Sequence, residues 1–223
     1  MQRGPLFKAA DLQTLIQCLR AVGQSVGPRT GPDRRSKEDK ELFVFRRYAA
    51  TLAAHGKWPL PCSVTMGESP DFMIAFPGGE RGLEVTEATT EAFQRWLTRS
   101  ESQPDLCDEP DDGSVGDIPE REWCKDVVDA IEAKVRLIHG YRPARHHDIV
   151  IYSSHPTDAV RKVAGRHTGH NLLQELAAQH ASSWRLETRL GTIGVIDDKT
   201  LIYDLLGSCE RLPINEQSQD ISA

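Results

Sequence analysis

The 223-residue sequence lacks paired cysteines and long apolar runs. Its five cysteines are scattered with no Cys-x-x-Cys pair, so neither a disulfide framework nor a zinc knuckle is expected. No apolar stretch reaches the roughly 20 residues of a membrane-spanning helix, and the first residues lack the apolar centre of a signal peptide. These absences predict a cytoplasmic protein with reduced thiols and no membrane-spanning segment.

Several enzyme signatures are also missing. The sequence contains no Gly-rich phosphate loop, no Gly-x-Ser-x-Gly elbow and no dinucleotide fingerprint. The histidine pairs His146-His147 and His167/His170 invite a zinc hypothesis, but neither comes with a cysteine or a further acid at a recognised spacing. We therefore expect loop histidines there rather than zinc ligands.

The net charge of −6 is distributed unevenly. Residues 101–120 contain eight acids and no lysine or arginine. Without these eight charges the remaining chain would carry a net charge of +2, so the body of the protein is mildly basic and one segment is acidic. The total charge therefore does not exclude a nucleic-acid partner.

Length and composition are typical of one globular domain spanning residues 1–223, with 39% hydrophobic and 27% charged residues. Apolar periodicity predicts helices at 7–22, 37–56, 119–141, 157–164 and 169–182, and a short helix in TTEAFQRWL. Strands are expected at 70–76, 81–87, 147–154, 190–197 and 200–206, and residues 101–118 are expected to form an acidic mobile loop. This order of elements predicts an α/β fold with a mixed central β-sheet flanked by helices.

Two carboxylates interrupt the apolar strands of the expected hairpin, SPDFMIAFPGGERGLEVTE. Because side chains alternate between the two faces of a strand, Asp71 lies on the face opposite to Phe72 and Ile74. In the second strand Glu84 alternates with Leu83 in the same way. Both acids are therefore expected on the same face of the hairpin.

The turn predicts how the two strands pair. A loop centred on Gly78-Gly79 pairs residue 76 with 81, 74 with 83 and 72 with 85. Asp71 then lies opposite Thr86, and Glu84 is its diagonal neighbour at about 7 to 8 Å. Two like charges at this distance repel each other, and a bound Mg²⁺ or Mn²⁺ ion would relieve the repulsion through oxygen ligands. An exposed acidic sheet face without a metal is the alternative interpretation.

These residues resemble a known nuclease motif. Pro70-Asp71, followed after a hairpin by Glu84-Val85-Thr86, is similar to the PD-(D/E)XK nuclease superfamily, which has the restriction-endonuclease-like fold. The family's core is a helix, three strands, a helix and a further strand, and it would cover residues 36–153. The resemblance implies a metal-dependent endonuclease that hydrolyses phosphodiester bonds, with Asp71 and Glu84 as catalytic metal ligands. It also implies DNA as the substrate, with RNA as the alternative, and a homodimer in which each subunit cuts one strand.

The sequence departs from the motif at Thr86, where the family has a lysine that orients the attacking water and stabilises charge in the transition state. Lys134 is the candidate replacement, because the superfamily tolerates a lysine on another element. It lies on the core-facing stripe of the expected helix 119–141, where a lysine without a partner is rare. Lys125, in contrast, aligns with acidic residues and is expected to face solvent. A structural ion pair is the alternative role for Lys134.

An acid from the preceding helix often joins the two motif acids in this family. The expected helix 37–56 has an apolar stripe that includes Phe45, and one turn before this stripe lies Glu41. The resemblance therefore gives Glu41 as the third metal ligand, with Glu38 as the second choice.

Basic residues gather in short clusters that could neutralise phosphates. The candidates for nucleic-acid binding are Arg46, Arg47, Arg142 and Arg145. The acidic segment could compete for such a groove, in which case deleting residues 101–118 should tighten nucleic-acid binding.

Two other functions remain compatible with the sequence. A non-catalytic domain of the same fold could bind nucleic acid or a protein partner, and the missing motif lysine favours this alternative. A small-molecule enzyme that uses the strand acids for proton transfer has less support, because no second set of catalytic side chains converges on them.

Overall fold

The computed structural model describes residues 4–26, 36–89, 120–138, 141, 144, 146–153, 167–187, 189–196 and 200–214. Within these residues the chain forms one eight-stranded sheet and four helices. The strands are β1 Gly4–Ala9, β2 Cys62–Met66, β3 Phe72–Phe76, β4 Gly79–Ala88, β5 His146–Ser153, β6 Leu190–Ile196, β7 Thr200–Tyr203 and β8 Glu210–Pro213. The helices are α1 Leu12–Ser25, α2 Lys37–Ala54, α4 Glu120–Ile138 and α6 His167–Glu187.

The sheet is mixed, and its strands follow one another in sequence order from β1 to β8. Strands β1 to β4 are antiparallel neighbours, β4, β5 and β6 run parallel, and β6 to β8 are again antiparallel. The parallel step from β4 to β5 is possible because the connection between them contains α4. The predicted α/β class with a mixed central sheet is confirmed.

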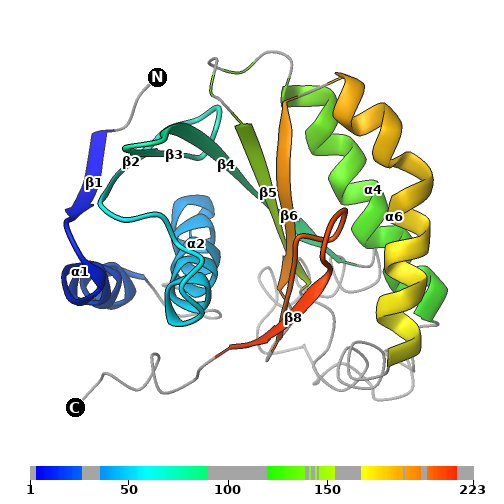
Figure 1. The fold of residues 1–223 in the computed structure, drawn as a ribbon, viewed down its shortest axis with the longest axis horizontal. Coiled ribbons are helices and arrows are strands. Elements are labelled where there is room, and N and C mark those ends of the chain that lie inside the picture. Colours follow the sequence, from blue (N-terminus) through cyan, green and yellow to red (C-terminus); the bar gives the residue numbers. More distant parts are fainter. Residues whose placement is uncertain are drawn as a thin grey trace, which may run out of the picture.

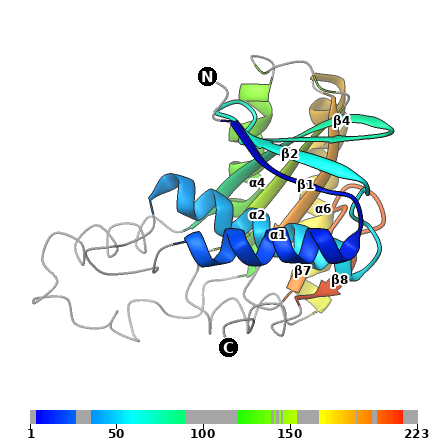
Figure 2. The ribbon, with the colours of Figure 1, turned by 90° about the vertical axis from the view of Figure 1, so that its left-hand side faces the viewer.

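Helices cover both faces of the sheet. Figure 1 shows α1 and α2 on one side and α4 and α6 on the other, and Figure 2 shows α1 lying in front of α2 on the first side. The alternation of side chains along β5 separates the two cores, because Val150 packs on the α2 side while Ile149 and Ile151 pack on the α4 side. A residue's position in its strand therefore decides which helix layer it meets.

The α2 side is built around aromatic residues. Helix α2 begins with a capping box, in which the Ser36 side chain accepts from the Asp39 backbone N–H and the Asp39 side chain accepts from the Ser36 backbone N–H. Further along α2, the Phe45 ring stacks on Phe72 of β3 with ring centroids 4.3 Å apart. This packing fixes the apolar face of the β3–β4 hairpin against α2.

The opposite side is filled by the apolar stripe of α4. Trp123, Val127, Ile131, Val135 and Ile138 are buried, and their helix packs against β4, β5 and α6. The indole N–H of Trp123 donates to the Ser153 hydroxyl at 3.0 Å, so this buried polar group has a partner. The periodicity that predicted helix 119–141 is confirmed over 120–138.

The structure corrects several predicted elements. Residues 7–9 belong to strand β1, so the first helix begins at Leu12 instead of residue 7, and it continues through Gly23 to Ser25. Strands β1, β2 and β8 were not predicted. The expected acidic loop, the helix at 157–164 and, apart from its first residue Thr89, the short helix in TTEAFQRWL lie outside the described residues.

Within the described ranges, no helix combines the length and apolar character needed to cross a membrane. Four cysteines are described and form no disulfide in the structure, namely Cys18, Cys62, Cys124 and Cys209. Cys107 lies outside the described residues.

Candidate active site

The two acids of the hairpin lie directly opposite each other. Residue 76 pairs with 79, 74 with 81 and 72 with 83, and one further step along this register brings Asp71 opposite Glu84. The predicted register was wrong by two residues, because the turn is Pro77-Gly78 and Gly79 already belongs to β4. A shift of two residues keeps every side chain on its face, so the prediction that both acids share one face is confirmed.

Backbone hydrogen bonds lock the two carboxylates together. The backbone N–H of Val85 donates to Oδ2 of Asp71 at 2.8 Å, and the backbone N–H of Asp71 donates to Oε1 of Glu84 at 3.2 Å. Each acid therefore accepts a hydrogen bond from the strand that carries the other. Asp71 and Glu84 are almost fully buried, with 3% and 1% of their surfaces exposed.

Lys134 of α4 completes the cluster, as its position on the core-facing stripe predicted. Its Nζ lies 2.6 Å from Oε2 of Glu84 and 4.0 Å from Oδ2 of Asp71. The Lys134 side chain keeps 19% of its surface exposed, so it is less deeply buried than either acid. Lys125 on the same helix is largely exposed and pairs with Asp129, which confirms the prediction that it faces solvent.

Tyr141 is a site residue that the sequence interpretation missed. Its hydroxyl lies within hydrogen-bonding reach of the Glu84 carboxylate, which also pairs with Lys134. Burial raises the pKa of Tyr141 well above its ordinary range, and the charges of Glu84 and Asp71 raise it further, so the hydroxyl remains a proton donor. A signal for it existed, because Tyr141 follows Lys134 by seven residues, or two helical turns.

The electrostatics of the cluster centre on Glu84. Burial raises the pKa of Glu84 to about 7, and the charge of Asp71 raises it as well, whereas Lys134 and the hydroxyl of Tyr141 lower it. Two acids face one ammonium, so the fully ionised cluster carries a net negative charge. Near neutral pH the fold therefore holds Glu84 close to its protonation point, and an added cation would favour the ionised form.

The donor atoms of the pair fit a hard divalent cation. Mg²⁺ in proteins is often held by one or two carboxylates, with waters and substrate phosphates completing the shell. Asp71 and Glu84 could supply such a carboxylate pair, since one ammonium nitrogen already reaches both. No larger group of three or more His, Cys, Asp and Glu residues suited to a metal occurs in the described part of the chain.

Glu41 does not join this pair, contrary to the expectation from the resemblance. It lies on α2, which packs on the opposite face of the sheet from Lys134 and α4. Glu41 is buried there and forms an ion pair with Lys37, with 3.3 Å between Nζ and Oε1. The apolar stripe of the helix correctly predicted that Glu41 lies beside a core. It could not predict on which side of the sheet that core lies. Glu38, the second choice, lies on the same helix.

The two arginines of α2 have packing roles. Arg47 is buried, and its guanidinium lies 5.4 Å from the centre of the Phe43 ring, so it is not available to a phosphate in this conformation. Arg46 is half-buried, and its guanidinium lies over α1 at Gly23, where an added methyl group would come within 2.6 Å of it. The role of Arg46 and Arg47 in nucleic-acid binding stays a prediction.

Most of the remaining candidates from the sequence, namely two arginines, the acidic segment and the side chains of two histidines, fall outside the described residues. Arg142, Arg145 and the acidic segment 101–118 fall outside the described residues. His146 and His147 belong to strand β5 and not to a loop, and His147 is buried. The side chains of His167 and His170 also lie outside the description.

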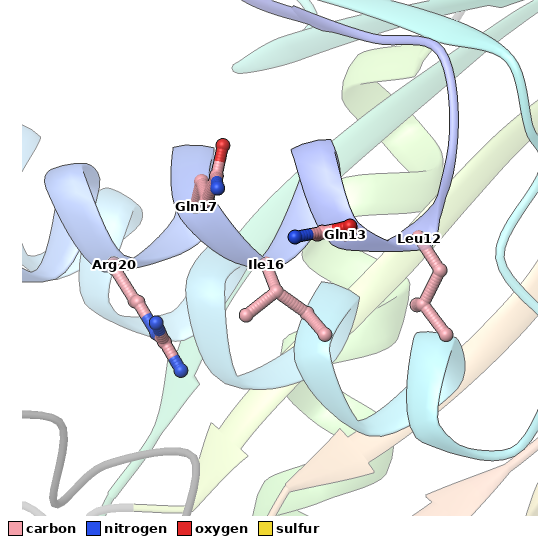
Figure 3. A pocket seen from close by; sticks show the side chains of 5 residues that line it. All are labelled: Leu12, Gln13, Ile16, Gln17 and Arg20. Carbon is pink, nitrogen blue, oxygen red and sulfur yellow. The ribbon is translucent and has the colours of Figure 1, made fainter.

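A hollow of about 430 Å³ lies on α1, away from the acids. It is lined by Leu12, Gln13, Ile16, Gln17 and Arg20, and Figure 3 shows Leu12, Ile16 and Arg20 pointing to the same side of the helix. Helix α1 belongs to the α2 layer, so this hollow does not form part of the site at Lys134.

Comparisons with known proteins give no relative. No family model matches the chain, and no curated protein or solved structure matches it significantly in sequence or in fold. The function must therefore be inferred from the site itself.

Proposed function

We propose that this protein is a metal-dependent nuclease of the restriction-endonuclease-like type, which hydrolyses phosphodiester bonds, with DNA as the expected substrate. The observation that carries the proposal is the cluster of Asp71, Glu84 and Lys134, in which two buried acids on neighbouring strands converge on one lysine. Lys134 lies where it could take the role of the motif lysine that Thr86 replaces.

The order of elements around the cluster supports the same proposal. Helix α2 is followed by β2, β3 and β4, then by α4 and β5, and these four strands are neighbours in the sheet. This is the helix, three strands, helix and further strand that the resemblance implies for residues 36–153. One of these three strands, β2, was not predicted from the sequence.

Each residue of the cluster would have a separate task. Asp71 and Glu84 would hold Mg²⁺ or Mn²⁺, which when bound activates water and neutralises charge on the phosphate. Lys134 would orient the attacking water and stabilise the negative charge that develops on the phosphate oxygens. The backbone N–H groups of Val85 and Asp71 keep both carboxylates fixed, so little reorganisation is needed before reaction.

Plasmid digestion with Mg²⁺ or Mn²⁺ tests the proposal. We expect the wild-type protein to cut, and Glu84→Ala and Lys134→Ala to lose at least about 100-fold in rate, the usual cost of removing a group that stabilises transition-state charge. Lys125→Ala is the matched control, because Lys125 lies on the same helix in an exposed pair with Asp129. Equal cleavage by all four proteins would exclude this site as the catalytic centre.

One other result would favour a different function. If the wild-type protein binds DNA but cleaves neither DNA nor RNA with either ion, the chain is a non-catalytic domain that binds nucleic acid. The observation that favours this alternative is Thr86, because a threonine cannot supply the charge of the motif lysine. Fluorescence anisotropy with labelled DNA and RNA, run beside the digestion, separates the two outcomes.

A further inference from the structure

Tyr141 is partly buried against the core on the α4 side and interacts with Glu84. It follows the last residue of α4 by three positions, and its backbone N–H donates to the carbonyl of Ile138 at 3.0 Å. Tyr141 packs against the core on the α4 side of the sheet, which is the side that carries Lys134. From there its hydroxyl reaches the carboxylate of Glu84.

The Tyr141 ring is supported from behind by His147. The two rings meet edge to face at a tilt of 62°, with centroids 6.0 Å apart. His147 is itself buried, and it pairs with Gly82 across the parallel strands β5 and β4. A methyl group added at Gly82 would lie 2.7 Å from Nδ1 of His147 and 3.0 Å from Cγ of Pro70. Gly82 therefore leaves the space that the imidazole occupies.

Lys134 and Tyr141 differ in what they would do when a divalent cation arrives. The ammonium of Lys134 carries a positive charge, so it is repelled by a cation bound to the same carboxylates. The hydroxyl of Tyr141 is a neutral donor, and a hydrogen bond from it to Glu84 is compatible with a bound cation. Of the two described side chains that contact Glu84 from the α4 side, Tyr141 can therefore hold the carboxylate both before and after the ion binds, together with the backbone N–H of Asp71.

We propose that Tyr141 is a positioning residue, which orients Glu84 for a divalent cation and is itself held in place by His147 over Gly82. The inference rests on the proposed metal-dependent function and adds a residue to the same site. Partners that orient a metal ligand typically change metal affinity by 10-fold or more when they are removed. The effect should therefore appear as weaker metal binding and not as a loss of fold.

Mn²⁺ binding, measured by electron paramagnetic resonance or calorimetry without any substrate, tests the proposal. Tyr141→Phe keeps the ring against His147 and removes only the hydroxyl, and we expect its Mn²⁺ affinity to fall about 10-fold. The Mn²⁺ concentration for half-maximal cleavage should rise by the same factor, while the rate at saturating Mn²⁺ changes less. Tyr152→Phe is the matched control, because Tyr152 lies on the opposite face of β5 against Phe43.

A second variant tests the support behind the ring. Gly82→Ala should displace His147 and weaken Mn²⁺ binding in the same direction. Unchanged Mn²⁺ affinity in Tyr141→Phe would overturn the positioning role alone. If the wild-type protein does not bind Mn²⁺, both the metal site and the positioning role of Tyr141 are overturned. If it binds Mn²⁺ but does not cleave, the nuclease activity is overturned, and the comparison of Mn²⁺ affinity between the wild type and Tyr141→Phe still decides the role of Tyr141.

Discussion

The two faces of the sheet each bury an ionic cluster, and the clusters differ in their balance of charge. On the α2 face, Asp148 of β5 pairs with Arg81 of β4 at 3.1 Å and accepts from the Thr192 backbone N–H at 2.8 Å. On the α4 face, Asp71 and Glu84 share the single ammonium of Lys134. Asp148 and Glu84 are equally buried, each with 1% of its surface exposed.

This difference separates a structural pair from a candidate site. One acid and one base on the α2 face compensate each other, and removing either leaves a buried charge without a partner. The α4 face keeps an excess acid, so its fully ionised state has a net negative charge that a divalent cation could neutralise. Burial raises the pKa of both Asp148 and Glu84, but only Glu84 also has a second carboxylate beside it that raises its pKa.

The largest effect on stability is expected on the α2 face. Arg81→Met should lower the free energy of unfolding by about 3 kcal/mol or more, because it leaves Asp148 buried without its cation. Urea unfolding at constant pH measures this, with Lys57→Met as the control. Lys57 also pairs with an acid, Glu210, at 2.9 Å, but that pair is partly exposed and should contribute less than about 1 kcal/mol. Similar losses in the two variants would contradict the structural role of Arg81.

On the α4 face, Glu84→Gln should increase stability at high pH. The pKa of Glu84 rises from 4.5 to about 7 on folding, so the folded state binds this proton more tightly than the unfolded chain. The contribution of Glu84 to stability is therefore present in full below pH 4.5 and is lost as the pH rises to about 7, a change of about 3 kcal/mol.

The measurement is the difference in unfolding free energy between Glu84→Gln and the wild type at several pH values. This difference should grow in favour of the variant from pH 5 to 7 and then stay constant. A variant that is less stable than the wild type by the same amount at every pH would contradict the pKa assigned to Glu84.

A smaller effect is expected from metal addition. A ligand that binds only the folded state at about 30 times its dissociation constant stabilises it by about 2 kcal/mol. Mg²⁺ should therefore raise the melting temperature of the wild type and of Arg81→Met, but not that of Glu84→Gln. Differential scanning fluorimetry measures the shifts, and an equal shift in all three proteins would show that the ion binds elsewhere.

The smallest effect is expected at Lys125. Its pair with Asp129 on α4 is exposed, and such pairs contribute roughly 0 to 1 kcal/mol. Lys125→Ala should therefore leave both unfolding and cleavage close to the wild-type values. A loss comparable to that of Lys134→Ala would show that the charge of α4 as a whole, and not the position of Lys134, controls the site.

The sequence predicted the features that depend on periodicity. Alternation along β3 and β4 placed Asp71 and Glu84 on one face, and this result survives a register error of two residues. The helical stripe placed Lys134 toward the core in the same way. The register itself depends on which two residues form the turn, and a run of Pro77, Gly78 and Gly79 allows more than one choice.

Other features depend on tertiary arrangement and could not be read from periodicity. The stripe of α2 pointed Glu41 toward a core, but the connections of the chain decide that this core is on the other face. Strand β1 has a register irregularity between Pro5 and Phe7 and lies at the edge of the sheet, so its short pattern was absorbed into the first helix. Tyr141 lies beyond the end of α4, in a stretch where the basic residues were the stronger signal.

The most direct test of the site is a crystal structure of the protein soaked in Mn²⁺, with an anomalous difference map. We expect a peak about 2 Å from a carboxylate oxygen of both Asp71 and Glu84, with the ammonium of Lys134 moved away from its present position. The same soak of Glu84→Gln should give no peak there. A wild-type map without a peak between the two acids, while Lys134 keeps both contacts, would contradict the account and assign the cluster to structure alone.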